Sequence, residues 1–376
     1  MAFSTVWGFG NVINGFSEYN GLQAIVAWLI IFAIYFVPYA LMVGELGSAF
    51  KEHGGGVSSW INETIGPKIA YYAGWTYWIV HMPYISQKPQ GVMIATSWAI
   101  FQDKRISDMN PVLMQGICLA IFLIGLYIAS KGLNPLKKLA TLAGSSMFIM
   151  SILFILLMIA APAITNAPLN SIDWSVKTFM PTFDVKFFTS LSILVFAVGG
   201  CEKISPYVNQ MKDPAKGFSK GMITLAIMVA VCAILGTISL GMMFDSNNIP
   251  NDLMTNGAYY AFQRLGEYYH VGNLFVVIYA LTNLVGQVST LIISIDAPLR
   301  MLLDSADKRF IPEAMFKQNK HGAYVNGQKL VMVIVSILII VPAFGIGNVD
   351  DLVKWLVKLN AVCMPLRYLW VFVAYI

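Results

Sequence analysis

Two glycines and a carboxylate interrupt an apolar run in the middle of the chain, at Phe196-Ala-Val-Gly-Gly-Cys-Glu202. Lipid offers no hydrogen-bond partners, so backbone groups that are freed by such a break need a buried cavity or a ligand. A second apolar segment, near the start of the chain, has a similar interruption at Trp7-Gly8-Phe9-Gly10-Asn11. Interrupted helices at matching places in two halves of a chain indicate a binding site between them.

Glu202 follows the glycines of the second interruption by two residues. An ionisable residue inside a membrane is costly and is functional by default. We therefore expect Glu202 to act in the site, as a gate or in proton coupling. The alternative is that it lies near the cytoplasmic end of its helix and pairs with Lys203 or with a lysine of a loop.

Lys88 ends a charge-free stretch that contains His81 and Tyr84. It could face a cavity and bind an acidic ligand or a carboxylate, or it could extend to the outer membrane interface. His81 lies about midway along the same predicted helix, where it could line a wet cavity and titrate near neutral pH. The alternative is a packing role. Tyr84 is one turn further on and shares that face.

The elements that position these residues are membrane-spanning helices. The chain has 376 residues, of which 57% are hydrophobic and only 11% are charged, whereas soluble domains carry about 25% charged residues. Charge-free stretches long enough to cross a bilayer recur along it. The sequence therefore predicts an all-α polytopic membrane protein with about ten helices, which run over 1–16, 22–46, 68–100, 111–130, 139–161, 186–207, 219–243, 271–299, 329–346 and 351–376.

Basic residues are distributed unevenly between the predicted loops. With the N-terminus in the cytoplasm, the inside loops hold fifteen lysines and arginines, Lys203 among them, and the outside loops hold five. This asymmetry fixes the orientation, and it explains the net charge of +5 without a nucleic-acid partner. The four cysteines fall in predicted helices with no metal-ligand spacing. We therefore expect neither a metal nor another cofactor.

The chain divides into two similar halves, 1–162 with helices one to five and 163–376 with helices six to ten, in a single transmembrane domain. Each half opens with a glycine-interrupted helix. Five helices are an odd number, so the second half must enter the membrane from the opposite side, which is the plan of an inverted repeat. The chain ends inside an apolar run, and this predicts about twelve helices in the full protein.

Three loop segments carry a family resemblance. They are Gly44–Trp60 with its Glu-Leu and three consecutive glycines, Val208–Pro214, and Ala297-Pro-Leu-Arg300 with Phe310-Ile-Pro312. In this order and spacing, and together with Phe196-Ala-Val-Gly-Gly-Cys-Glu202, the chain resembles the amino acid–polyamine–organocation permeases over its whole length. Three further segments look most like the bacterial glutamate/γ-aminobutyrate antiporter branch, namely Ser58–Pro67, Tyr207–Met211 and Lys317–Gly322.

The resemblance implies a LeuT-like 5+5 inverted repeat with broken helices one and six. It implies a secondary active transporter of small amino acids in the bacterial cytoplasmic membrane, monomeric or homodimeric, which works as an exchanger by alternating access and is not an enzyme. The alternative on the same fold is a symporter of amino acids or polyamines that is coupled to protons or sodium. A channel or a membrane-embedded enzyme is a more distant alternative.

The resemblance also assigns site residues. Gly8, Phe9, Gly10 and Asn11 would present N–H groups to the substrate carboxylate, and Phe196, Ala197 and Gly199 would offer carbonyls to its amine. Broken helices provide free groups of both kinds. His81 and Tyr84 would line the cavity, Trp7 would act as a gate, and Ser289 and Thr290 could contribute to a sodium site. Relatives commonly have Gly-Ser-Gly-aliphatic in the first break. Phe9 and Asn11 depart from that pattern, and Phe9 would narrow the site.

Overall fold

The computed structural model describes residues 6–52, 56–106, 108–132, 134–210, 213–304 and 309–376. In these residues the regular structure is helical, apart from an isolated antiparallel bridge between Gln318 and Tyr324. Parts of two motifs, His53–Gly55 and Met211–Lys212, lie outside the described residues. The fold is therefore all-α, as the sequence predicts.

The first half of the chain contains helices one to five. Helix one includes α2 (Phe9–Glu18), and helix two combines four consecutive elements. Helix three is α6 followed by α7, and helices four and five are α8 and α9. The bounds after α2 are η1 (Gly21–Gln23), α3 (Ala24–Ile31), the π-helical η2 (Phe32–Phe36), α4 (Val37–Ala49), α5 (Val57–Thr64), α6 (Pro67–Ile79), α7 (His81–Ile100), α8 (Pro111–Ala129) and α9 (Asn134–Ile164).

The second half contains helices six to ten. Helix six is α11 followed by η3, helices seven, eight and nine are α12, α14 and α15, and helix ten is α16 followed by α17. The bounds are α10 (Val176–Phe179), α11 (Val185–Val198), η3 (Cys201–Gln210), α12 (Pro214–Gly241), α13 (Leu253–Tyr268), α14 (Leu274–Leu303), η4 (Glu313–Phe316), α15 (Val325–Ile340), η5 (Val341–Phe344), α16 (Val349–Cys363) and α17 (Pro365–Tyr375).

Local sequence signals start several of these helices. Asn110 caps α8 by accepting hydrogen bonds from the backbone N–H groups of Val112 and Leu113, with Pro111 in the first turn. Asp184 caps α11 in the same way through the N–H of Phe187. Such caps satisfy N–H groups that have no partner inside the helix, so these two boundaries are set by the sequence itself.

Eight helical segments in the described part of the chain are long and apolar enough to cross a membrane. Two predicted spans are not among them. One is helix one, where α2 has ten residues, and the other is helix three, where α7 carries His81, Lys88 and two glutamines. Residues of both helices line the cavity described below. The short α2 and the polar side chains of α7 are therefore features of the candidate site.

Three features differ from the sequence prediction. Helix three is split at Val80, because Pro83 cannot donate a backbone hydrogen bond to the preceding turn. Helix ten is split at Met364, where Pro365 begins α17. Predicted loops contain additional helices, among them α5 after helix two and α13 after helix seven.

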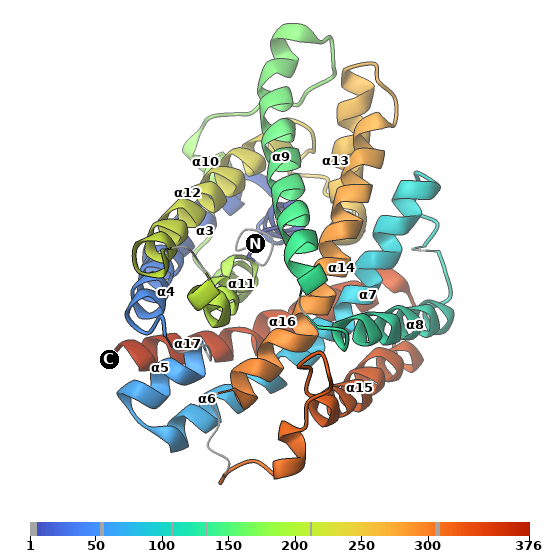
Figure 1. Cartoon of the computed structure of the whole chain (residues 1–376). Helices are drawn as coiled ribbons and strands as arrows, with labels where there is room; N and C mark the ends of the chain where they lie inside the picture. Colours follow the sequence, from blue (N-terminus) through green and yellow to red (C-terminus); the bar gives the residue numbers. More distant parts are fainter. Residues whose placement is uncertain (1–5, 53–55, 107, 133, 211–212, 305–308) are drawn as a thin grey trace.

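The site elements are held by their neighbours in the bundle. In Figure 1, α14 lies beside α7 and α9 near the centre of the molecule, and α16 and α17 follow each other across its lower part. The short α2 contacts α11, α12 and α13. The first break is therefore enclosed by elements from the second half of the chain.

Candidate functional site

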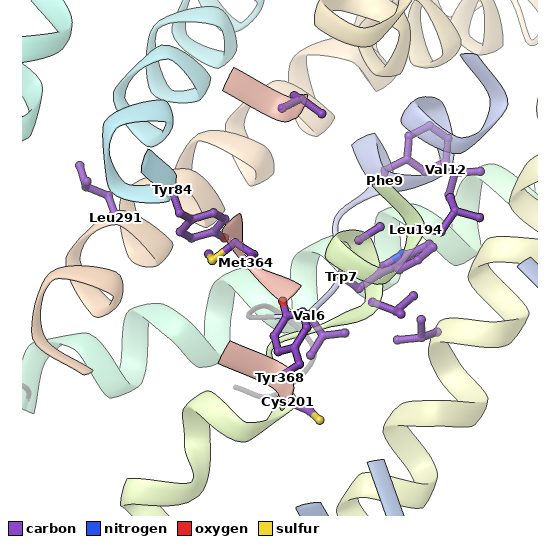
Figure 2. Close-up of a cluster of buried hydrophobic side chains, with 14 of the residues drawn as sticks. Val6, Trp7, Phe9, Val12, Tyr84, Leu194, Cys201, Leu291, Met364 and Tyr368 are labelled. Carbon is purple, nitrogen blue, oxygen red and sulfur yellow. The ribbon is translucent and has the colours of Figure 1, made fainter. Parts of the chain in front are cut away.

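A cavity of about 200 Å³ lies between the two breaks. Figure 2 shows part of its surroundings and labels Val6 and Trp7 of the first break together with Tyr84, Met364 and Tyr368, all of which line the cavity. The predicted site residues in its wall are Trp7, Gly8, Gly10, Asn11, Tyr84, Lys88, Phe196, Ala197, Gly199 and Thr290. The two interruptions therefore border one common space.

The first break exposes backbone donors. Gly8 is extended, with φ −144° and ψ 151°, and α2 begins at Phe9. The N–H groups of Phe9 and Gly10 stand at the helix start, where no intrahelical acceptor is available. The N–H of Asn11 differs from our expectation, because it donates to the carbonyl of Gly8 at 2.9 Å.

The side chain of Asn11 joins the two breaks. Its Nδ2 donates to the carbonyl of Ala197 at 2.8 Å and lies 3.3 Å from the carbonyl of Val6. The predicted amine acceptor at Ala197 thus already holds one hydrogen bond. A carbonyl oxygen has two lone pairs, so this oxygen can still accept a second donor.

The second break follows α11. Gly199 is extended, and Gly200 has a φ of 111°, which L-residues with side chains rarely adopt. The chain then resumes as η3 at Cys201. The last carbonyls of α11, from Phe196 onwards, consequently point past the helix end without the normal helical donors.

The two predicted site glycines have different surroundings. A Cβ atom built on Gly10 meets nothing within 4 Å, so this position opens into the cavity. A Cβ atom on Gly199 would overlap the ring of Tyr368. Gly199 therefore makes room for a neighbouring side chain, whereas Gly10 leaves room for a ligand.

The side chain of Phe9 does not narrow the cavity, contrary to our expectation. Its ring packs in an aromatic cluster with Phe154 at 4.8 Å and Phe262 at 5.2 Å between centroids. In Figure 2 it lies beside Val12, away from Tyr84 and Tyr368. The Phe9 side chain is not part of the cavity wall, so Phe9 could offer only its backbone N–H to the site.

Three cationic side chains line the cavity, namely Lys88, Lys203 and Arg367. The ammonium groups of Lys88 and Lys203 lie 4.2 and 4.3 Å from the ring centroid of Tyr84. Lys88 also donates to Gln287 at 3.4 Å. The described residues of the cavity wall include no Asp or Glu, so the charge that faces the cavity is positive.

Glu202 is fully buried beside the cavity but is not part of its wall. It accepts hydrogen bonds from Tyr39 at 2.9 Å and Tyr77 at 2.8 Å, and it forms an ion pair with Arg367 at 3.3 Å. The alternative partner, Lys203, is wrong, because its side chain lies on Tyr84 instead. Helices two, three, six and ten meet at this carboxylate.

His81 is fully buried and does not line the cavity, which corrects our expectation. Arg367 lines the cavity, and its guanidinium contacts both nitrogens of the His81 ring. His81 Nδ1 also lies 2.7 Å from the carbonyl oxygen of Tyr77. The ring is therefore enclosed by Arg367 and the backbone of Tyr77.

Arg367 and Lys203 are the important residues that sequence reasoning missed. Arg367 stands in an apolar run of helix ten, and the rule that drew attention to Glu202 and Lys88 applies equally to it. Lys203 was assigned to a cytoplasmic loop, yet it is 2% exposed in the cavity wall. Its proximity to the glycine break was the available signal.

The two residues predicted for a sodium site differ in their relation to the cavity. Thr290 lines the cavity and Ser289 does not. Near them, the thioether of Met147 from helix five lies between helix one and helix eight. A Cβ atom on Gly8 would stand 3.2 Å from Met147 Cε, and one on Gly286 would stand 2.8 Å from Met147 Sδ. A methionine therefore fills part of the junction of these two helices.

Comparison with known proteins identifies the fold and the family. Residues 1–376 match the family model described as "Amino acid permease". This chain belongs to the amino acid permease family. The aspartate/glutamate permease AcaP of Lactococcus lactis subsp. cremoris is 52% identical over 379 residues, which cover 100% of this chain and 77% of that protein.

A more distant relative and a solved structure also match most of this chain. A glutamate/gamma-aminobutyrate antiporter of Lactococcus lactis subsp. lactis is 23% identical over 349 residues, which cover 91% of this chain and 67% of the antiporter. The crystal structure of MhsT in complex with L-phenylalanine matches with a TM-score of 0.62 at 14% identity, and it covers 98% of this chain and 86% of MhsT. The predicted LeuT-like fold is thereby confirmed.

The family settles the broad function. The permease is an integral membrane protein and a secondary transporter of amino acids, as the sequence predicts, and not an enzyme.

Proposed function

We propose that this permease transports acidic amino acids, aspartate and glutamate, by exchange across the bacterial cytoplasmic membrane, with its N-terminus in the cytoplasm. One observation carries the proposal. Three cations, Lys88, Lys203 and Arg367, line the cavity, and the described residues of the wall include no carboxylate. A cavity lined by one sign of charge attracts ligands of the opposite sign.

The breaks suit the part that all α-amino acids share. The free N–H groups of Phe9 and Gly10 stand at the positive end of α2, which is a ready-made site for a carboxylate. The carbonyls of Phe196 and Ala197 at the end of α11 suit an ammonium group. If the backbone groups bind the α-carboxylate and the α-ammonium group, the cationic side chains remain available to bind the side chain of the substrate.

The relatives support the same substrate class, since the protein at 52% identity is named an aspartate/glutamate permease. One relative, from Lactococcus lactis subsp. lactis at 22% identity, is named a probable agmatine/putrescine antiporter. A polyamine carries only positive charges, which the ammonium groups of Lys88 and Lys203 in the cavity wall would repel. The wall thus disfavours the polyamine alternative.

Met147 supports exchange over sodium symport. Its thioether is a soft ligand, whereas hard cations bind oxygen. With this side chain between Gly8 and Gly286, the junction of helices one and eight offers less oxygen to sodium. Transport that is driven by a counter-substrate needs no such ion.

Uptake by purified permease in proteoliposomes tests the proposal. Labelled aspartate and glutamate are supplied outside, with or without unlabelled amino acid inside, and unlabelled asparagine, glutamine or putrescine compete. We expect uptake of both acids to require internal amino acid and to resist competition by putrescine. Uptake driven by a sodium or proton gradient into empty vesicles would contradict exchange, and strong competition by putrescine would contradict the substrate class.

A further inference from the structure

We propose that Lys203 is the residue that selects the acidic side chain, by binding its carboxylate, whereas Arg367 is reserved for Glu202 and does not bind substrate. The inference rests on the proposed transport of acidic amino acids and adds to it a division of roles between cations of the same cavity.

Lys203 is the buried cation without an anionic partner. It is 2% exposed, and within the described ranges no carboxylate lies at ion-pair distance from it. Its ammonium lies on the face of Tyr84, at 4.3 Å from the centroid. Removing an ammonium group from water is expensive, and one contact with an aromatic ring recovers only part of that cost. An anion that enters the cavity would supply the remainder.

The neighbouring carboxylate cannot serve this purpose. Glu202 and Lys203 are consecutive residues of a 3₁₀ segment, in which successive side chains point about 120° apart. Glu202 turns towards helices two, three and ten, where Tyr39, Tyr77 and Arg367 use both of its oxygens. Lys203 turns towards Tyr84 and the cavity.

Arg367 borders the same cavity but already has an anionic partner in Glu202. Its guanidinium pairs with Glu202, contacts the His81 ring and lies 3.1 Å from the hydroxyl of Tyr368, whereas its Nε has no hydrogen-bond partner among the described residues. A substrate carboxylate at this position would have to compete with the buried carboxylate of Glu202. Arg367 therefore forms part of the cavity wall without binding the substrate carboxylate.

Lys88 is a secondary partner. It is only half-buried, and its ammonium already donates to the oxygen of Gln287. Both ammonium groups lie within 4.3 Å of the centre of the Tyr84 ring. A carboxylate beside this ring can therefore contact Lys203 and be attracted electrostatically by Lys88 as well. With the α-carboxylate on Phe9 and Gly10, the side-chain carboxylate is left for Lys203.

The experiment compares acids with their amides. Binding of aspartate, asparagine, glutamate and glutamine to purified permease is measured as ligand-induced thermal stabilisation and as competition for labelled aspartate. The variants are Lys203→Gln and Lys203→Met, which lose the charge and keep a long side chain. Lys104→Gln is the matched control, because Lys104 is half-exposed on an outside loop and pairs with Asp252 at 3.2 Å.

We expect both Lys203 variants to lose about tenfold or more of their affinity for the acids, as befits the loss of a charged hydrogen bond, and to keep their affinity for the amides. Lys203→Arg should restore part of the preference, and Lys104→Gln should behave as wild type. If the wild type prefers acids and both Lys203 variants keep that preference, this inference is wrong and the proposed function stands. If the wild type itself does not prefer acids, both fail.

Discussion

At the scale of single residues, the ion pair of Glu202 and Arg367 is the most consequential contact that the sequence did not reveal. Both side chains are buried, and each is held by further hydrogen bonds. Burying two charges costs much of what their attraction returns, so such a pair adds little net stability. Losing one partner is different, because the other charge is then buried alone.

Glu202→Gln should therefore lower the free energy of unfolding by about 3–5 kcal/mol, measured by denaturant unfolding in detergent micelles. The double variant Glu202→Gln with Arg367→Met removes both charges, so we expect it to be more stable than Glu202→Gln alone. A loss below about 1 kcal/mol in the single variant would show that Arg367 finds another partner, contrary to the geometry described above.

At the scale of elements, the two breaks are the features that create the site. Gly200, with its φ of 111°, interrupts helix six between α11 and η3, where a side chain would be strained, and Gly10 leaves the start of α2 open to the cavity. The contacts that a Cβ atom would make distinguish the two kinds of glycine. A glycine required for folding would place it against other protein atoms, whereas a glycine that leaves space for a ligand would place it in the cavity.

Gly10→Leu should abolish amino acid binding and uptake, because the leucine side chain would fill the cavity. Its free energy of unfolding should change by less than about 1 kcal/mol, since leucine has the higher helix propensity. Gly116→Leu is the control, as Gly116 is exposed on α8 and equally free of neighbours. Normal binding by Gly10→Leu, measured by ligand-induced thermal stabilisation, would place the site elsewhere.

The sequence predicted these elements with uneven success. Charge-free stretches located α8, α12 and α14, and glycines in apolar runs located both breaks, because lipid permits few alternatives to a continuous helix. The amphipathic α13 was missed, since Asn256 and Arg264 make its sequence look like a loop. The directions of Phe9 and His81 could not be predicted, because they depend on how each helix is rotated against its neighbours.

At the scale of the whole molecule, large apolar side chains remain exposed along several helices. Examples are Ile124 on α8, Ile149 on α9, Ile227 on α12 and Ile337 on α15. In water such a surface would be a liability, but it is the surface that a membrane protein presents to lipid.

Ile227→Lys tests that lipid-facing surface. Ile227 is 60% exposed near the middle of the span Lys216–Gly241, where a lysine costs about 2.5–3.5 kcal/mol of membrane insertion. We expect a clear drop in membrane-inserted protein, measured by fractionation. Val176→Lys should be tolerated, because Val176 is 72% exposed on α10 in the loop between the halves. Equal insertion of both variants would contradict the orientation of α12 towards lipid.

The hydrogen bond from Asn11 to Ala197 has a consequence for the transport cycle. It ties the first turn of α2 to the last turn of α11 at 2.8 Å, across a separation of 186 residues in the chain. If the two ends move together, the distance between them is the same whichever side of the membrane the cavity faces. The amino acid backbone is then bound with equal strength on both sides. Discrimination between substrates, and any difference between inward and outward affinity, comes from the side-chain pocket around Tyr84.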